Sequence, residues 1–160
     1  MTGVVVAYDY WRGLGLKELG FRTDTLKGSL ILNLIVTALL VIFMVWAFKD
    51  GLIRAPVIPS WGLFFAYYLF ISSPSQEFLF RGNLFALMER AGVKGAASQI
   101  TVSAVTYSFL HVFYHDAITL AATFIMGLVW GGIYYKYPNF TGVALSHAVL
   151  GVVSIKVGII

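Results

Sequence analysis

The chain has few charged residues and no cysteine. Asp, Glu, Lys and Arg make up 11 % of its 160 residues, against about 25 % in typical soluble domains. Hydrophobic residues make up 59 %, and the mean hydropathy is +0.86. So little charge cannot coat a globule in water, and disordered, collagen-like and coiled-coil chains need other compositions. The composition therefore predicts an integral membrane protein.

The missing cysteines and the sign of the net charge restrict the chemistry further. Without cysteine, the chain has no disulfides, thiolate nucleophiles or cysteine metal ligands. The formal net charge is +4, which in a soluble protein suggests a nucleic-acid partner. In a membrane protein, basic residues instead set the orientation. We therefore expect the lipid bilayer, and not nucleic acid, as the partner of this chain.

Apolar stretches long enough to cross a bilayer recur along the chain. A helical crossing needs about 20 predominantly apolar residues, and five stretches approach or exceed that length: 30–48, 61–88, 96–113, 117–135 and 140–160. We predict an all-α fold, a single polytopic transmembrane helix bundle of about five spans over residues 30–160. Pro74 lies in the middle of the second stretch, so we expect that helix to break or kink there.

Residues 1–29 mix basic, acidic and apolar side chains, with Tyr10 and Trp11 as aromatic anchors. This pattern predicts an interfacial segment lying on the lipid headgroups. If the N-terminus is cytoplasmic, five spans place seven basic residues inside and two outside. The inside set is Arg12, Lys17, Arg22, Lys27, Arg90, Lys94 and Lys136, and the outside set is Lys49 and Arg54. The positive-inside rule therefore predicts a multi-pass protein with a cytoplasmic N-terminus.

Four ionisable residues lie within the predicted spans: Glu77, Arg81, His111 and His147. Each costs at least ~2.5–3.5 kcal/mol on insertion scales, so its presence needs a cause. Glu77 and Arg81 are one helical turn apart and close enough to pair. Two interpretations stay open for all four: they carry function, or they form an ion pair and hydrogen bonds that lock helices together. Under both, we expect them to face the bundle interior.

Other polar residues extend these helix faces. On an ideal helix, Ser73, Gln76 and Asn83 share one polar arc with Glu77 and Arg81. Such an arc is expected to face protein or a water-filled cavity as a unit.

The third and fifth stretches each carry a histidine with regularly spaced neighbours. Tyr107, His111 and His115 recur every four residues, and the two histidines have the spacing of a helical metal-ligand pair. Val112 stands where a zincin has its glutamate, so that motif is absent and we predict no metal site. On the last stretch, His147 shares a stripe with small residues such as Gly151, which lets a neighbouring helix come close.

The order of these elements resembles the CAAX-processing protease and bacteriocin-immunity family (CPBP, Abi), a group of intramembrane proteases. The family's Glu-Glu-x-x-Phe-Arg-Gly motif is matched by Gln76-Glu77-Phe78-Leu79-Phe80-Arg81-Gly82. Its Phe-x-x-x-His motif is matched by Tyr107-Ser108-Phe109-Leu110-His111. Its His-x-x-x-Asn motif, after a Thr-Gly turn, is matched by Thr141-Gly142 and then His147-Ala148-Val149-Leu150-Gly151. The match covers about residues 60–155.

The resemblance implies a hydrolytic site with Glu77 as general base, His111 orienting the water, and His147 as acid or oxyanion donor. Arg81 would set the ionisation of Glu77. Two supporting positions depart from the family pattern: Gln76 replaces the first glutamate of the pair, and Gly151 replaces the asparagine. An amide takes no proton from water, and glycine offers no side-chain donor. By helical rise alone, His111 lies about 9 Å outward of its span's centre, while Glu77 and His147 lie about 4 Å inward.

Three hypotheses for function follow. The first is a glutamate-dependent intramembrane endopeptidase acting on a peptide or membrane protein. The second is a family member that has lost catalysis and serves as an accessory or binding subunit of a larger membrane complex, as the changes at Gln76 and Gly151 would allow. The third is a cofactor-binding membrane protein with His111 or His147 as axial ligand to a haem or chlorin; the sequence does not identify a cofactor.

Overall fold

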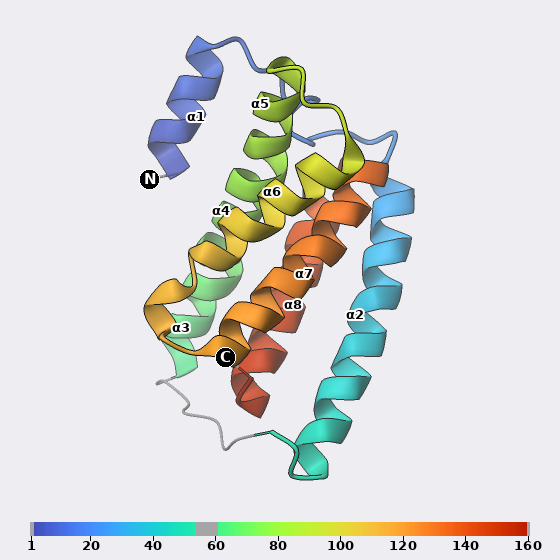
Figure 1. Ribbon diagram of the computed structural model, residues 1–160, viewed down its shortest axis with the longest axis vertical. Helices are drawn as coiled ribbons and strands as arrows, with labels where there is room; N and C mark the ends of the chain where they lie inside the picture. The colour runs from blue at the N-terminus through green and yellow to red at the C-terminus, as the bar shows by residue number, and fades with distance from the viewer. Residues whose placement is uncertain (1, 54–60, 160) are drawn as a thin grey trace.

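The computed structural model describes residues 2–53 and 61–159, and within these ranges it is all-α with no strand (Figure 1). An N-terminal helix, α1 (Thr2–Trp11), precedes the long helix α2 (Leu26–Lys49). The second predicted stretch follows as a run of helical segments from Trp61 to Arg90, described below. The chain ends with α6 (Ala96–Phe109), α7 (Ala117–Lys136) and α8 (Phe140–Val157).

Within the described residues, three helices are long and apolar enough to cross a membrane: α2, α7 and α8. Thr25 precedes α2, and Asp116 and Asn139 cap α7 and α8 by accepting hydrogen bonds from backbone N–H groups of their first turns. These helices agree with the predicted all-α membrane protein, and their ends fall within a few residues of the expected ones.

Of the break or kink expected at Pro74, the break is wrong, because the helix does not end there. The chain is helical through α3 (Trp61–Tyr67), the π-helical turn η1 (Tyr68–Ser72), α4 (Ser73–Glu77), a second π-helical turn η2 (Phe78–Asn83) and α5 (Leu84–Arg90). The Ser73 N–H bonds the Tyr68 carbonyl five residues back. This wider turn accommodates the proline without ending the helix.

The π-helical turns also divide the polar arc expected from ideal helical spacing. Each wide turn changes the direction of every later side chain, because it holds more residues than an α-turn. Asn83 therefore contacts α1, through a hydrogen bond from its Nδ2 to Asp9 Oδ1. Glu77 and Arg81 instead face α6, α7 and α8. The single arc is thus two separate contact surfaces.

Small residues set the close helix contacts of the bundle. A Cβ at Gly127 would lie 2.7 Å from the Ala104 Cα, so only glycine allows α7 to approach α6 this closely. Between α2 and α8, the Thr37 and Ser146 hydroxyls share a 2.7 Å hydrogen bond. The main core lies between these helix pairs and includes Met44, Phe85, Tyr107, Trp130 and Leu150.

The N-terminal segment contacts the bundle at the end where α5 ends and α6 begins (Figure 1). Arg90 donates to the carbonyls of Arg12 and Gly13 and pairs with Glu18 at 2.9 Å. Asp9 is only 1 % exposed, and its Oδ2 has no hydrogen-bond partner among the described residues. Burial raises the pKa of Asp9, and the hydrogen bond from Asn83 opposes part of that rise.

Asp9→Asn is expected to stabilise the docked N-terminal segment near neutral pH. The raised pKa means that the folded state favours protonated Asp9, so the carboxyl's contribution is largest below its ordinary pKa of about 3.9 and is lost as the pH rises through the folded value. The neutral variant avoids that loss and keeps an oxygen for Asn83. In detergent melts, the midpoint of the variant should exceed that of the wild type by more at pH 7.5 than at pH 4. A difference that shrinks with rising pH would contradict this assignment.

Candidate functional site

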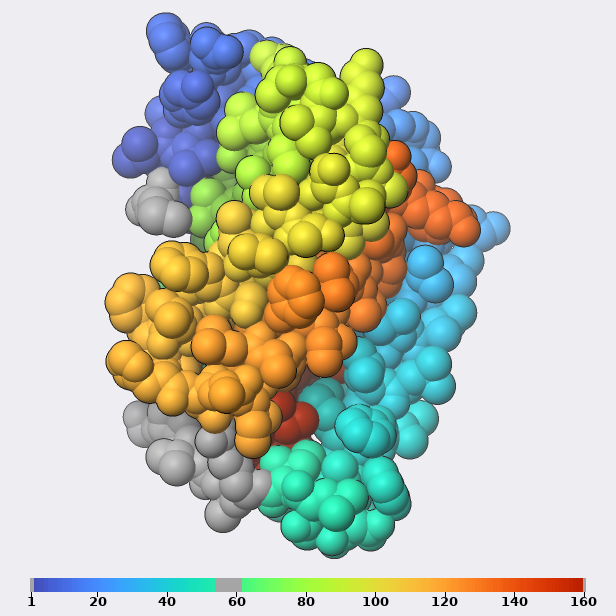
Figure 2. Space-filling model, viewed as in Figure 1, coloured from blue at the N-terminus to red at the C-terminus, as the bar shows by residue number. Residues whose placement is uncertain are grey.

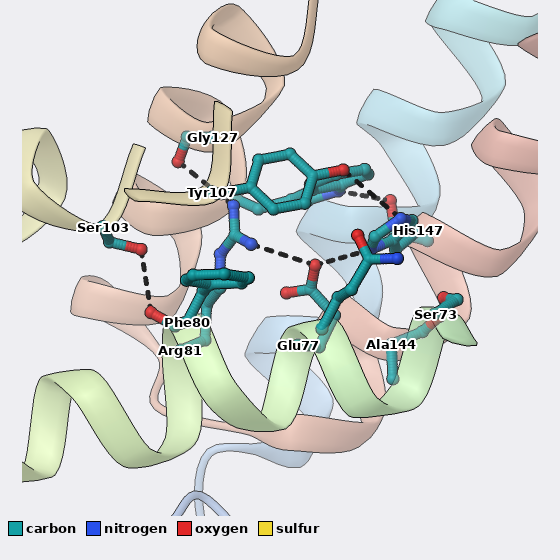
Figure 3. Close-up of polar contacts among 12 residues, drawn as sticks. Ser73, Glu77, Phe80, Arg81, Ser103, Tyr107, Gly127, Ala144 and His147 are labelled. Atoms are coloured by element: carbon teal, nitrogen blue, oxygen red, sulfur yellow. Dashed lines mark hydrogen bonds and ion pairs between the residues drawn. The ribbon is translucent and has the colours of Figure 1, made fainter. Parts of the chain in front are cut away.

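The centre of the candidate site is the Glu77 carboxylate, which accepts two hydrogen bonds through one oxygen. Glu77 Oε1 lies 2.6 Å from His147 Nδ1 and 3.1 Å from Arg81 Nη1 (Figure 3). Glu77 and Arg81 are both 0 % exposed, and His147 is 2 % exposed. The predicted Glu77–Arg81 pair is therefore confirmed. His147 of α8 also contacts the same Glu77 oxygen.

Aromatic rings and a backbone carbonyl enclose the Arg81 guanidinium. Its Cζ lies 4.5 Å from the Tyr107 ring centroid and 5.5 Å from that of Trp130. Its Nη2 lies 3.5 Å from the Gly127 carbonyl oxygen of α7. Arg81 thus connects the π-helical turn η2 with α6 and α7, and it pairs with the equally buried Glu77. Such cation–π contacts gain strength when they are desolvated.

Three neighbours fix the orientation of the His147 ring. Its Nδ1 faces Glu77, and its Nε2 lies 3.3 Å from the Tyr107 hydroxyl. The Trp130 ring stacks on it with centroids 4.6 Å apart, and the Trp130 indole N–H is held by the Ser146 hydroxyl at 2.9 Å. Because an ionised Glu77 can only accept, Nδ1 carries a proton, and Nε2 of a neutral ring is then the acceptor. This is the carboxylate–imidazole arrangement that prepares histidine for proton transfer.

His111 lies in the same region but does not contact Glu77 or His147 directly. Helix α6 ends at Phe109, and the His111 Nδ1 donates to the Tyr107 carbonyl at 3.0 Å. The Tyr107 ring lies between the two imidazoles, with centroids 4.9 Å from His111 and 5.6 Å from His147. Helical rise predicted that His111 lies at a different height from Glu77 and His147, and in the structure the Tyr107 ring contacts both imidazoles across this difference. The predicted interior positions are confirmed, since Tyr107, His111 and His147 are all buried.

A cavity of about 790 Å³ adjoins this cluster. Its polar lining residues include Tyr68, Gln76, Tyr107, His111 and His147, and the rest of its wall is mainly apolar side chains of α2, α3, α7 and α8. In Figure 2 the surface is hollowed between the lower parts of α7 and α2, where part of α8 is visible. The cavity is therefore a mostly apolar chamber with a polar patch of imidazole, phenol and amide groups.

Gln76, and not Glu77, is among the described residues that line the cavity. The Gln76 Nε2 donates to the Ser72 hydroxyl at 3.0 Å, while its Oε1 is buried without a partner in the described part of the chain. Glu77 does not line the cavity itself but contacts His147, which does. The Gln76 side chain thus lies in the cavity wall, whereas the Glu77 side chain lies behind the His147 ring.

The geometry disfavours His147 as the axial ligand of a cofactor. Both ring nitrogens of His147 already face protein groups, Glu77 and Tyr107. Within residues 2–53 and 61–159, no group of three or more His, Cys, Asp or Glu side chains is placed to hold a metal ion. His115, the possible second ligand of a His111 pair, is exposed beyond the end of α6 and has a left-handed backbone with φ of 51°.

Trp130 and Tyr68 are the site residues that sequence reasoning missed. Trp130 stacks on His147, and Tyr68 lies edge-on to the same ring with centroids 6.2 Å apart. Aromatic residues are common throughout the chain, so the sequence did not distinguish Trp130 and Tyr68 as residues of the site.

Taken together, a membrane-type helical bundle with a buried Glu–His–Arg cluster beside an apolar cavity defines an intramembrane site suited to acid–base chemistry. Residues 58–153 match the Rce1-like family, described as type II CAAX prenyl endopeptidase Rce1-like. The match covers more than half of the chain, so the chain belongs to this family, and the resemblance to CAAX-processing proteases is confirmed. Family membership implies an integral membrane protein with intramembrane peptidase function. Searches of curated proteins and of solved structures found no match.

Carbene labelling from the acyl-chain phase is expected to miss the site and to modify the outer faces of the bundle. Leu34, Phe70 and Leu145 are 70 %, 79 % and 55 % exposed, whereas Tyr107 and His147 are 3 % and 2 % exposed. Mass spectrometry of digested, labelled protein should therefore find adducts on the first three residues and none on the last two. Strong labelling of His147 would show that it faces lipid and would contradict the site described here.

Proposed function

We propose that this protein is an intramembrane endopeptidase that hydrolyses a peptide bond within or near the bilayer, with water activated by the Glu77–His147 couple. The observation that carries the proposal is the 2.6 Å contact between a fully buried carboxylate and an imidazole that lines the cavity. A carboxylate in this position orients the ring and stabilises the imidazolium that forms on proton uptake.

In the proposed reaction, water takes the place of the Tyr107 hydroxyl at His147 Nε2 and gives this nitrogen a proton as the water oxygen attacks the peptide carbonyl carbon. His147 then gives that proton to the leaving amine nitrogen as the carbon–nitrogen bond breaks, which yields a carboxylic acid and an amine. The acid's proton passes to the amine, so the products are a carboxylate and an ammonium group. This differs from direct proton uptake by Glu77, because His147 lines the cavity and Glu77 does not. Tyr107 and His111 line the same wall, and we propose that they position the water and the substrate.

The apolar wall of the cavity favours a peptide that is embedded in the membrane or carries an apolar group. Aliphatic and aromatic side chains from α2, α7 and α8 surround most of the cavity. A soluble polar peptide would leave this surface uncovered, whereas an apolar segment removes it from water. The substrate class we propose is therefore a membrane-inserted or membrane-anchored peptide.

We also propose that residues 30–160 form one transmembrane domain of about five spans and that residues 1–29 lie at the cytoplasmic interface. The additional spans beyond α2, α7 and α8 would be the helical run from Trp61 to Arg90 and α6. Arg90 ends α5, Lys94 precedes α6 and Lys136 ends α7. These helix ends lie at the end of the bundle where the N-terminal segment also docks (Figure 1). A positive end of this kind supports a cytoplasmic N-terminus.

A second candidate function is that of a catalytically inactive subunit of a larger membrane complex. The observation that favours it is the amide at the cavity wall: Gln76 holds the place next to Glu77 and accepts no proton from water. Under this alternative, the buried Glu77–Arg81–His147 cluster serves only to lock α8 to the helix that carries η2. The protein would then purify in a fixed ratio with other membrane subunits.

The two candidates are separated by turnover in liposomes. Wild-type protein is expected to cleave at least one peptide of a library of membrane-anchored peptides, and His147→Gln is expected to lose this activity with its fold retained. The Gln side chain keeps a hydrogen-bonding group but takes up no proton. Absence of cleavage by the wild type, together with copurification of a membrane complex at fixed ratio, would establish the second candidate instead.

A further inference from the structure

A tyrosine and a glycine in the cavity wall fit each other so closely that a side chain at the glycine would require the tyrosine ring to move. A Cβ built at Gly151 would lie 1.7 Å from the Tyr68 Oη, 2.4 Å from its Cζ and 2.7 Å from its Cε1. Contacts below 3.0 Å are essentially never seen for real Cβ atoms, so the phenol and a side chain at position 151 compete for one place. The Tyr68 hydroxyl occupies the space that such a side chain would fill.

This shared place lies next to the proposed catalytic histidine. Gly151 is one helical turn after His147 on α8, so both residues present the same face of that helix. The Tyr68 ring is edge-on to the His147 ring at 72°, and all three residues line the cavity. Tyr68 begins the π-helical turn η1, which brings its ring over α8. The phenol is therefore a hydrogen-bond donor beside His147, in contact with the space where a substrate would lie.

Peptide hydrolysis requires a donor at this kind of position. Attack of water on the carbonyl carbon moves negative charge to the carbonyl oxygen, and a pre-placed donor stabilises that oxyanion. Gly151 provides no side-chain donor. We propose that the Tyr68 hydroxyl donates to the oxyanion and is a catalytic residue of this protein, in the place that a donor side chain at position 151 would otherwise take. This inference rests on the proposed peptidase function.

Tyr68→Phe is the direct test, because it removes the hydroxyl and keeps the ring that packs against Gly151 and His147. Loss of one oxyanion donor lowers kcat by ~10²–10³-fold, so we expect a loss of this size with KM little changed and the melting midpoint retained. The matched control is Tyr10→Phe, since Tyr10 is 85 % exposed on α1 and its hydroxyl is remote from the cavity. This control should retain wild-type kcat.

The steric conflict between Tyr68 and a side chain at position 151 can also be tested by thermal stability, which is independent of activity. Gly151→Ala is expected to lower the melting midpoint in detergent, because its methyl group collides with the phenol. Adding Tyr68→Ala should recover much of that loss, whereas adding Tyr68→Phe should not, because the ring remains. Gly151→Asn is likewise expected to fit only together with Tyr68→Ala, and that double variant should show more turnover than Tyr68→Ala alone.

The outcomes distinguish this inference from the proposed function. Wild-type turnover with an equally active Tyr68→Phe variant overturns the role of Tyr68 and leaves the peptidase assignment standing. A wild type without turnover overturns the peptidase assignment, and the role of Tyr68 is lost with it. If Gly151→Ala lowers the melting midpoint equally in the wild type and in the Tyr68→Ala variant, then Tyr68 and a side chain at position 151 do not compete for the same space.

Discussion

Glu77→Gln is expected to lower the kcat of peptide hydrolysis by about 10²–10⁴-fold, the range typical of lost acid–base catalysis, because His147 loses the carboxylate that supports it as general base. The variant keeps the size of the side chain but removes the negative charge that holds His147 Nδ1 and stabilises its protonated form. It also leaves the Arg81 guanidinium buried without its 3.1 Å counter-charge. Turnover of the cleaved membrane-anchored peptide, normalised to folded protein, is the measurement.

The control for this experiment is Glu89→Gln, which removes a carboxylate from an exposed position near the end of α5. It should retain wild-type turnover, which shows that a loss in Glu77→Gln is specific to the site. Activity that survives Glu77→Gln would mean that the buried carboxylate takes no part in proton transfer. The Glu77–His147 contact would then be purely structural.

Arg81→Ala is expected to cost more stability than any exposed charge change, and more than Glu77→Gln. Removing one partner of a buried ion pair costs roughly 3–5 kcal/mol in soluble proteins, because the other charge remains buried and unpaired. Here the variant leaves Glu77 buried without its Arg81 partner. It also removes the contacts of the guanidinium with Tyr107, Trp130 and the Gly127 carbonyl. The yield of folded protein and the melting midpoint in detergent should both fall.

An exposed ion pair provides the comparison. Glu18→Ala breaks the Glu18–Arg90 pair, whose side chains are 44 % and 39 % exposed, and such pairs contribute only about 0.2–1 kcal/mol. Its midpoint should stay close to that of the wild type. Equal melting of wild type and Arg81→Ala would contradict the buried pair as a source of stability.

Local sequence patterns were sufficient to predict the helices and one contact of the site. Runs of apolar residues marked α2, α7 and α8, and the four-residue spacing of Glu77 and Arg81 predicted their pairing, since both depend on neighbours in sequence. The cost of burying charge was enough to place His147 inside the bundle. These features follow from composition and helical period alone.

The remaining features depend on contacts between distant segments. The π-helical turns around Pro74 changed side-chain directions that an ideal 100° period assigns, so the contact of Asn83 with Asp9 was not predictable. The 2.6 Å contact between Glu77 and His147 joins residues 70 positions apart. The fit of Tyr68 to Gly151 likewise depends on how α8 packs against η1. The glycine alone indicated close helix packing and a missing donor, but not which residue packs there.

The most direct test of the central claim is hydrolysis in water enriched in ¹⁸O. Purified protein in liposomes is incubated with membrane-anchored peptides, and the products are analysed by mass spectrometry. The account predicts new carboxyl termini that carry oxygen from solvent for the wild type, and their disappearance in His147→Gln protein that melts like the wild type. Labelled termini formed at equal rates by both proteins, or by neither, would contradict water activation by the Glu77–His147 couple.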